Sequence, residues 1–434
     1  MKQSVPPPSL LMRTIEQVFI GGLVLIFGLI VLHAPLSVFF GTHFGHLLLV
    51  KSWKELLMGV LLILALIIIT KRHAWRQFVR DPLLIASLAL ALLYVVSLQY
   101  GHGARSYGAG LLIDLRYVLY AVLVYVAARL FPEYRSIFLR AGLIGAIVVV
   151  GFGLLQFLLP KDFLSILGYS KLTITPYTTI DNYEGLVRLQ STLRGPNPLG
   201  AYAAVVVLVA SIVAIRAKLS RRIRVWLGVL ALGALILVFA SYSRSAYAGL
   251  LAGAFVAAGI LAGRRLVHRN VIIGLAVAII LVVGGIFAIR HTTFYTSVLQ
   301  HEVQGSGPAI NSNQGHTISL SDGLSKDIVH PLGYGTGSTG SASLLSKNGY
   351  IVENQYLYVA HEAGWVALAL FLFIIGALLR AAYQRREEPL AVGVLASGVA
   401  LLIIGFVLPV FADDTVSIVW FGLAALVAGT TRRE

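Results

Sequence analysis

Twelve apolar runs follow one another along the chain, each close to the length that a helix needs to cross a bilayer. A membrane's hydrocarbon core is about 30 Å thick, and a helix rising about 1.5 Å per residue crosses it in about 20 residues. The runs fall at about 18–34, 55–70, 82–100, 111–131, 141–159, 199–215, 225–240, 246–263, 271–289, 356–379, 391–411 and 415–429. We therefore predict an all-α polytopic membrane protein in which residues 1–434 form a single integral membrane domain with about twelve transmembrane helices.

Composition supports this prediction and excludes other classes of protein. Hydrophobic residues make up 58% of the chain and charged residues 12%, about half the charged share of soluble domains. This excludes a soluble multidomain enzyme and a disordered chain. The absence of cysteine excludes disulfides, thiolate catalysis and thiolate metal sites.

The distribution of positive charge predicts how the chain is oriented. The net charge is +16, and Lys and Arg are about twice as frequent in the connections on the N-terminal side of the membrane as in those on the other side. This bias is typical of cytoplasmic connections, so we predict that both termini are cytoplasmic. The positive charge is then a topology signal, and we expect the lipid bilayer, not nucleic acid, as the partner.

Two external connections are long enough to be functional. The first covers residues 160–198, and the second, at 290–355 between the ninth and tenth spans, is polar and rich in glycine and serine. All cytoplasmic connections are short and carry no Walker-type sequence. We therefore expect the chemistry on the outer side.

Four arginines are placed at or near the outer face. Arg116 lies inside the fourth span, where an arginine either pairs with another helix or faces a binding cavity. Arg194, with Arg188 upstream, precedes Asn197 and Pro198, predicted as the N-cap and first residue of the sixth helix. Such a helix start binds phosphate, although most caps are only structural.

Arg244 lies in the tight hairpin between the seventh and eighth spans, where a solvated interfacial arginine is the alternative. Together the arginines suit a ligand with two phosphates at the headgroup level.

The tenth span supplies the candidate proton-transfer groups. Glu353 is predicted at its outer boundary and Glu362 about 13 Å deeper, where a packing role is the alternative to a functional one. His330 lies on the large loop. His361 is interpreted as a satisfied polar group between helices, and Asp413-Asp414 as a solvated acidic pair.

These stretches, in this order, resemble the bacterial O-antigen ligase and polymerase superfamily. The matching pieces are Arg194 with Gly-Pro-Asn-Pro-Leu-Gly, Ser243-Arg244-Ser245, His330-Pro331-Leu332-Gly333-Tyr334-Gly335-Thr336-Gly337-Ser338, and Glu353-Asn354-Gln355-Tyr356-Leu357 with Glu362 and Gly364. The motifs cover about 190–365, and the layout of spans extends the resemblance over most of the chain. The sequence departs from the ligases at Glu353, where they have a catalytic histidine.

The resemblance implies a metal-independent, inverting glycosyltransferase of the bacterial inner membrane that uses no cofactor. Its donor would be a glycan on an undecaprenyl-diphosphate (polyprenyl-diphosphate) carrier, and its acceptor a hydroxyl of lipid A–core or of another glycan on the periplasmic side. Arg194 and Arg244, with Arg116 and Arg188, would bind the diphosphate. Glu353 would be the general base, with His330 and Glu362 as the other catalytic candidates.

Two alternatives are open at this point. The first keeps the class of enzyme and changes the acceptor, giving a surface polysaccharide polymerase or a protein O-oligosaccharyltransferase. The second is a membrane transporter without enzymatic activity, which would place its ionisable groups near the bilayer midplane.

Overall fold

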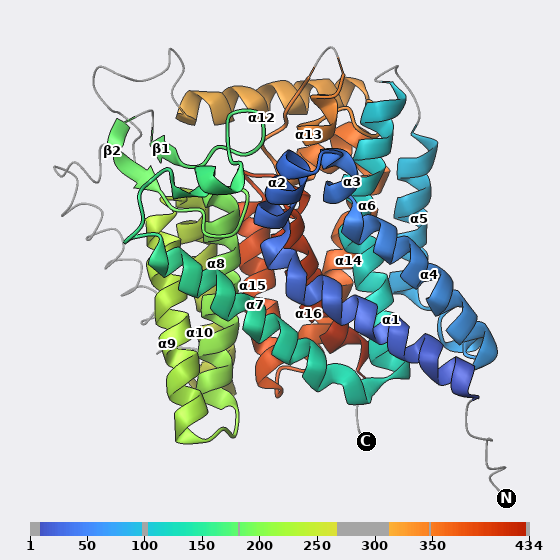
Figure 1. Ribbon diagram of the computed structural model, residues 1–434. Coiled ribbons are helices and arrows are strands. Elements are labelled where there is room, and N and C mark those ends of the chain that lie inside the picture. Colours follow the sequence, from blue (N-terminus) through green and yellow to red (C-terminus); the bar gives the residue numbers. More distant parts are fainter. Residues whose placement is uncertain (1–8, 98–102, 181–182, 267–311, 347–348, 431–434) are drawn as a thin grey trace, which may run out of the picture.

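The chain forms a bundle of helices whose order follows the apolar runs of the sequence (Figure 1). The computed structural model describes residues 9–97, 103–180, 183–266, 312–346 and 349–430. Within these ranges, eight helices are long and apolar enough to cross a membrane, and three shorter apolar helices accompany them. The run at 271–289 lies outside the described residues. A mostly helical architecture with several apolar helices of membrane-spanning length is thus confirmed, while the count of twelve spans stays a prediction.

The long helices follow the apolar runs but often begin before them. They are α1 (Leu10–Leu29), which continues through η1 (Ile30–Leu32) into α2 (His33–His43), α4 (Trp53–Lys71), α6 (Ala104–Leu130), α7 (Arg135–Leu155), preceded by η3 (Pro132–Tyr134), α8 (Pro196–Arg216), α9 (Arg221–Ala240), α10 (Arg244–Leu266) and α14 (Gln355–Gln384). The shorter apolar helices are α5 (Pro82–Val96), α15 (Pro389–Ile404) and α16 (Asp414–Gly429).

One end of the bundle carries most of the remaining structure, at the top of Figure 1. The elements there are α3 (Leu47–Lys51), η4 (Phe163–Leu167), the antiparallel strands β1 (Thr178–Ile180) and β2 (Tyr183–Arg188), α12 (Ser312–Val329) and α13 (Gly340–Ser343). The first turn of α1 and the last turn of α16 lie at the opposite end. We call the first of these ends the loop end. It contains the 160–198 connection and residues 312–346 of the large loop, whose residues 290–311 lie outside the described part.

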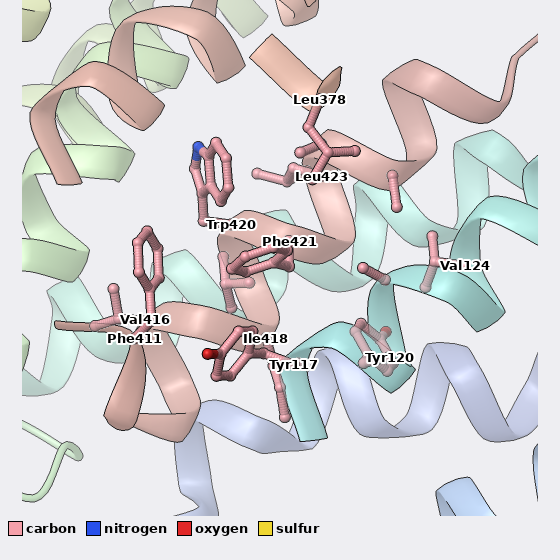
Figure 2. Packing of buried hydrophobic residues seen from close by; sticks show 14 of the residues in the cluster. Tyr117, Tyr120, Val124, Leu378, Phe411, Val416, Ile418, Trp420, Phe421 and Leu423 are labelled. Atoms are coloured by element: carbon pink, nitrogen blue, oxygen red, sulfur yellow. The ribbon is translucent and has the colours of Figure 1, made fainter. Parts of the chain in front are cut away.

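The packing centre of the bundle is α16, the most deeply buried helix of the described chain (Figure 2). The Phe421 ring lies 4.9 Å from that of Tyr117 on α6 and 5.0 Å from that of Trp420. Gly422 lets α6 approach, since a β-carbon there would lie 2.9 Å from the Tyr120 ring. The helix that carries Arg116 is therefore fixed against the core.

The long helix α14 is broken at Gly364, and the large loop fills the break. Gly364 has φ 84° and ψ 174° inside the helix. Tyr334 N donates to the His361 carbonyl at 2.6 Å, Gly335 N to the Glu362 carbonyl at 3.0 Å, and Trp365 N to the Pro331 carbonyl at 3.1 Å. Backbone polar groups in a membrane need partners within the protein, and the loop supplies them.

Replacing Gly364 by Ala is expected to destabilise the protein. The backbone conformation there costs a non-glycine residue about 1–3 kcal/mol, and a β-carbon would lie 2.7 Å from the Pro331 carbonyl oxygen. Thermal unfolding in detergent should show a melting temperature several degrees lower. The matched control is Gly376→Ala in the same helix, where a β-carbon meets nothing within 4 Å. An equal effect of the two substitutions would contradict a strained break at Gly364.

Candidate functional site

A cavity of about 290 Å³ lies at the loop end between α6, the start of α8, α13 and the segment preceding α16. Its lining includes Arg116 from α6, Arg194 just before α8, and Asp413. We call it the arginine cavity. Two of the four arginines selected from the sequence therefore share one cavity, whereas Arg188 and Arg244 are not among its lining residues.

Arg116 lines this cavity and also forms an interhelical ion pair with Glu55. Its side chain is 6% exposed, donates a hydrogen bond to the Ala412 carbonyl, and lies 3.8 Å from a carboxylate oxygen of Glu55. Its Nε atom has no hydrogen-bond partner in the described part of the chain. The guanidinium is thus fixed by its surroundings and retains a donor.

Arg194 is the accessible cation of the cavity. Its side chain is 48% exposed, with one guanidinium nitrogen 3.4 Å from the Ser341 hydroxyl and Nε 4.0 Å from the Asp413 carboxylate. Burial, with the charge of Arg194 as the next cause, lowers the pKa of Lys51 on α3. Positive charge therefore gathers around Arg194.

A buried ion-pair network supports this wall, and the sequence analysis missed it. Lys54 Nζ lies 3.1 Å from Glu55 and 3.1 Å from Asp414, and Asp414 also lies 3.0 Å from His33. The interpretation of Asp413-Asp414 as a solvated pair was wrong, because both residues are buried. Burial, and next the neighbouring Asp414, raises the pKa of Asp413. The sequence did offer one signal for this network, because two charged residues, Lys54 and Glu55, stand at the start of an apolar run.

Arg188 reaches the arginine cavity indirectly, through Asn197. It donates to the Asn197 side-chain oxygen at 2.6 Å and to the Ser241 carbonyl at 2.9 Å. The predicted N-cap was wrong by two residues: α8 begins at Pro196 with Gly195 as its N-cap. Since Pro196 and Pro198 have no N–H, the first turn offers less backbone for an anion than the sequence analysis expected.

Arg188 also lines a second cavity, of about 320 Å³, together with Lys161, Tyr177, Gln190 and Tyr242. Asn197 lines the arginine cavity, so the Arg188–Asn197 hydrogen bond joins the walls of the two cavities. The Gln190 side chain is 2% exposed, and its Oε1 accepts no hydrogen bond within the described residues.

Arg244 is the first residue of α10, after a connection from α9 that is as tight as predicted. The start of α10 lies close to the start of α8, because a β-carbon on Gly200 would lie 3.0 Å from the Ser243 β-carbon. Arg244 is therefore at the loop end and half-buried, beside the other arginines in the fold but outside the arginine cavity.

Glu362 is fully buried and held by the loop. Its Oε1 accepts from the backbone N–H of Gly337 at 3.1 Å and of Thr339 at 3.4 Å. Its charge interacts with that of Asp114 on α6. Glu362 Oε2 and Asp114 Oδ2 have no hydrogen-bond partner in the described part of the chain. Asp114 is not among the candidate site residues selected from the sequence.

Glu353 is paired with a histidine that the sequence analysis did not select. Its Oε2 lies 2.7 Å from His316 Nδ1 on α12, and the Glu353 side chain is 40% exposed. The His316 interaction lowers the pKa of Glu353. His316 lies in a polar stretch without a motif, so no sequence signal pointed to it. Glu353 itself is near the boundary where the sequence placed it.

His330 and His361 form a layered cluster with Tyr334. His361 Nδ1 lies 2.8 Å from Asp327, and both side chains are buried, which agrees with a satisfied polar role. Tyr334 stacks on His361 with ring centroids 4.5 Å apart, and the His330 ring lies 4.4 Å from Tyr334. His330 is thus held against the loop that fills the α14 break.

No protein-family model matches the chain, and no curated protein matches it. The resemblance to the O-antigen ligases and polymerases therefore rests on the motifs quoted above.

We expect Glu353 to contribute to stability only above acidic pH. Its pKa in the folded state is lowered, so the carboxylate stabilises the fold above its unfolded pKa of about 4.3. The contribution is lost as the pH falls through the folded-state value. The melting-temperature difference between the wild type and Glu353→Gln should be present at pH 6 and shrink below pH 4. Glu133→Gln, at an exposed carboxylate, is the control; acid profiles that differ equally from wild type in both variants would contradict the pairing.

Proposed function

We propose that the protein is a glycosyltransferase that moves a glycan from an undecaprenyl-diphosphate carrier to an acceptor hydroxyl at the outer face of the bacterial inner membrane. The observation that carries the proposal is the arginine cavity, where Arg116 and Arg194 from separate elements meet at the loop end of an apolar bundle. In this proposal both termini are cytoplasmic and the loop end faces the periplasm. The acceptor is lipid A–core, as in the ligases that the motifs resemble.

The two arginines have complementary tasks in this reaction. Arg116, fixed by Ala412 and Glu55, offers a preorganised charge, and half-exposed Arg194 closes on the diphosphate from the solvent side. Cleavage of the sugar–phosphate bond leaves additional negative charge on the diphosphate, which charged guanidinium donors stabilise. Arg188 and Arg244 complete the positive environment at the loop end without lining the cavity.

The proton of the acceptor hydroxyl passes to the Glu353–His316 pair. Glu353 stays ionised because its pKa is lowered, and it is accessible to solvent. Glu362 is 0% exposed and fixed by two backbone N–H groups, which suits it to positioning the loop. His330, in contact with Tyr334, is the remaining candidate for the base.

The second cavity is the proposed acceptor side. It presents the Tyr177 and Tyr242 rings together with Lys161, Arg188 and buried Gln190, a combination of apolar faces and hydrogen-bonding groups that suits a sugar. The Arg188–Asn197 hydrogen bond sets this cavity beside the arginine cavity. The donor diphosphate would then lie in the arginine cavity and the acceptor sugar in the second cavity, with Asn197 between them.

One observation favours the transporter alternative. Transporters bind their solutes at broken helices that carry ionisable groups deep in the membrane, and α14 is broken at Gly364 beside the buried pair Asp114 and Glu362. Solute flux in proteoliposomes without glycan transfer would support this alternative. The polymerase and protein-acceptor reactions differ only in acceptor, so assays with lipid-linked glycan and with pilin-type protein separate them.

Replacing Arg194 by Ala is expected to lower glycan transfer about 10- to 100-fold, since a hydrogen bond to a charged group contributes about 1.5–3 kcal/mol. The assay uses purified undecaprenyl-diphosphate-linked glycan and lipid A–core in proteoliposomes. Arg105→Ala, at an exposed arginine near the start of α6, is the matched control. If the two variants lose activity equally, or neither does, the diphosphate role of Arg194 is wrong. Arg244→Ala tests the neighbouring arginine, and near-normal transfer would remove it from the site.

Glu353→Gln and His316→Gln test whether the Glu353–His316 pair is the base. Both substitutions break the pair, so each should reduce the turnover number at neutral pH by about 100-fold or more, the typical contribution of general base catalysis. Substrate KM should change little. The pH–rate profile of each variant should lose the limb that the pair controls. Retained turnover in Glu353→Gln would transfer the role to His330, which His330→Gln then tests.

A further inference from the structure

An apolar groove lies between α7 and α9, away from the arginine cavity. The two helices touch where glycines allow it: a β-carbon on Gly153 would lie 2.6 Å from Leu237, and one on Gly233 would lie 2.8 Å from Val150. From this contact, α7 runs obliquely across the bundle while α9 stays upright, so they diverge toward the end opposite the loop end (Figure 1). The divergence leaves a cavity of about 370 Å³.

The groove has the lining of a lipid-chain site. Leu143 of α7 and Leu227 of α9 form facing walls, and Val206 of α8 and Leu423 of α16 are part of the lining too. Its other residues are also apolar or aromatic. It thus extends from the lipid-facing helices to the most buried helix of the bundle. An apolar cavity of this kind does not hold water, and in a bilayer the available apolar occupant is a lipid chain.

Positive charge surrounds one mouth of this groove. Ala217, Leu219 and Ile223 line the groove there. The chain between and beside them carries four exposed cations, Lys218, Arg221, Arg222 and Arg224, and none of the four has an ion-pair or hydrogen-bond partner for its side chain in the described part of the chain. Of the other arginines at the same end of the bundle, Arg72 is paired with Glu16, Arg129 with Asp81, Arg135 with Glu388 and Arg216 with Glu387. Exposed Arg13 and Arg80, which do not line the groove, have no side-chain partner in the described part of the chain.

We propose that this groove binds an anionic phospholipid, one acyl chain lying between α7 and α9 and the headgroup phosphate contacting the cations of 218–224. The orientation rule accounts for the sign of these charges. It does not account for the clustering of four unpaired cations at the mouth of an apolar cavity, and an anionic headgroup does. The start of α9 lies at the same mouth, where its backbone dipole adds to the attraction. The site is independent of the proposed glycan transfer.

Native mass spectrometry of the full-length protein with dioleoyl phosphatidylglycerol or dioleoyl phosphatidylcholine tests the proposal. The wild type should retain phosphatidylglycerol in preference to phosphatidylcholine. In Arg221→Gln/Arg224→Gln this preference should fall about fivefold for each cation removed. The control Arg13→Gln/Arg80→Gln removes two exposed cations predicted on the same membrane face and should keep the preference.

Filling the groove tests the acyl-chain part separately. Leu227→Trp, and Leu143→Trp on the opposite wall, should abolish phosphatidylglycerol retention, with thermal unfolding used to select the variant that remains folded. Three results would overturn the proposal: equal retention of the two lipids by the wild type, the same loss in the control pair as in the Arg221/Arg224 pair, or unchanged retention in a folded groove-filling variant.

Discussion

The need to satisfy backbone polar groups inside a membrane governs the loop end of this protein. The break at Gly364 frees backbone groups of α14, and the loop from Pro331 to Gly335 binds them. Because the loop must reach this depth, the residues that follow it are fixed as well. Gly337 and Thr339 bind Glu362, and Gly340 and Ser341 reach the arginine cavity. The backbone hydrogen bonds across the α14 break therefore position residues for both the buried carboxyl pair and the arginine cavity.

Charge burial supplies the second constraint. Lys54 lies 3.1 Å from the carboxylates of both Glu55 and Asp414, and Asp414 lies 3.0 Å from His33. Buried charges are tolerated in a protein only when they are paired in this way. Arg116 extends the network through Glu55 and faces the cavity on its other side. The network thus holds a cation rigidly at the cavity wall, while Arg194, outside it, remains half-exposed. A site with one fixed and one adaptable guanidinium suits an anionic ligand that enters from the surface.

The sequence predicted the apolar helices and two of the arginine cavity's lining residues, Arg116 and Arg194, for different physical reasons. Hydropathy reports bilayer crossing directly, so α4, α9 and α16 lie where apolar runs occur. The sequence grouped Arg194 with Arg244, and Arg116 with them, from their common depth near the outer face, and depth can be read from helix length. Arg116 and Arg194 line one cavity, which Arg244 does not line. Side-chain partners depend on helix rotation and on loop paths, which hydropathy does not encode. The contact of Asp114 with Glu362 and the pairing of His316 with Glu353 were invisible for that reason.

Access distinguishes the two polar centres and bears on which of them performs the chemistry. The carboxyl pair lies beneath Gly337, which is wedged against α6: a β-carbon on Gly110 would lie 2.5 Å from Gly337 N, and one on Gly337 would lie 2.2 Å from the Ser106 carbonyl. This contact joins two backbones, so no side-chain rotation can open a path to the carboxyl pair. Moving the loop away from α6 would also break the hydrogen bonds across the α14 break. Arg194 needs no such opening, since its guanidinium is already partly in solvent. A reaction at the surface therefore requires only side-chain motion, whereas transport through the carboxyl pair requires the loop to leave its place.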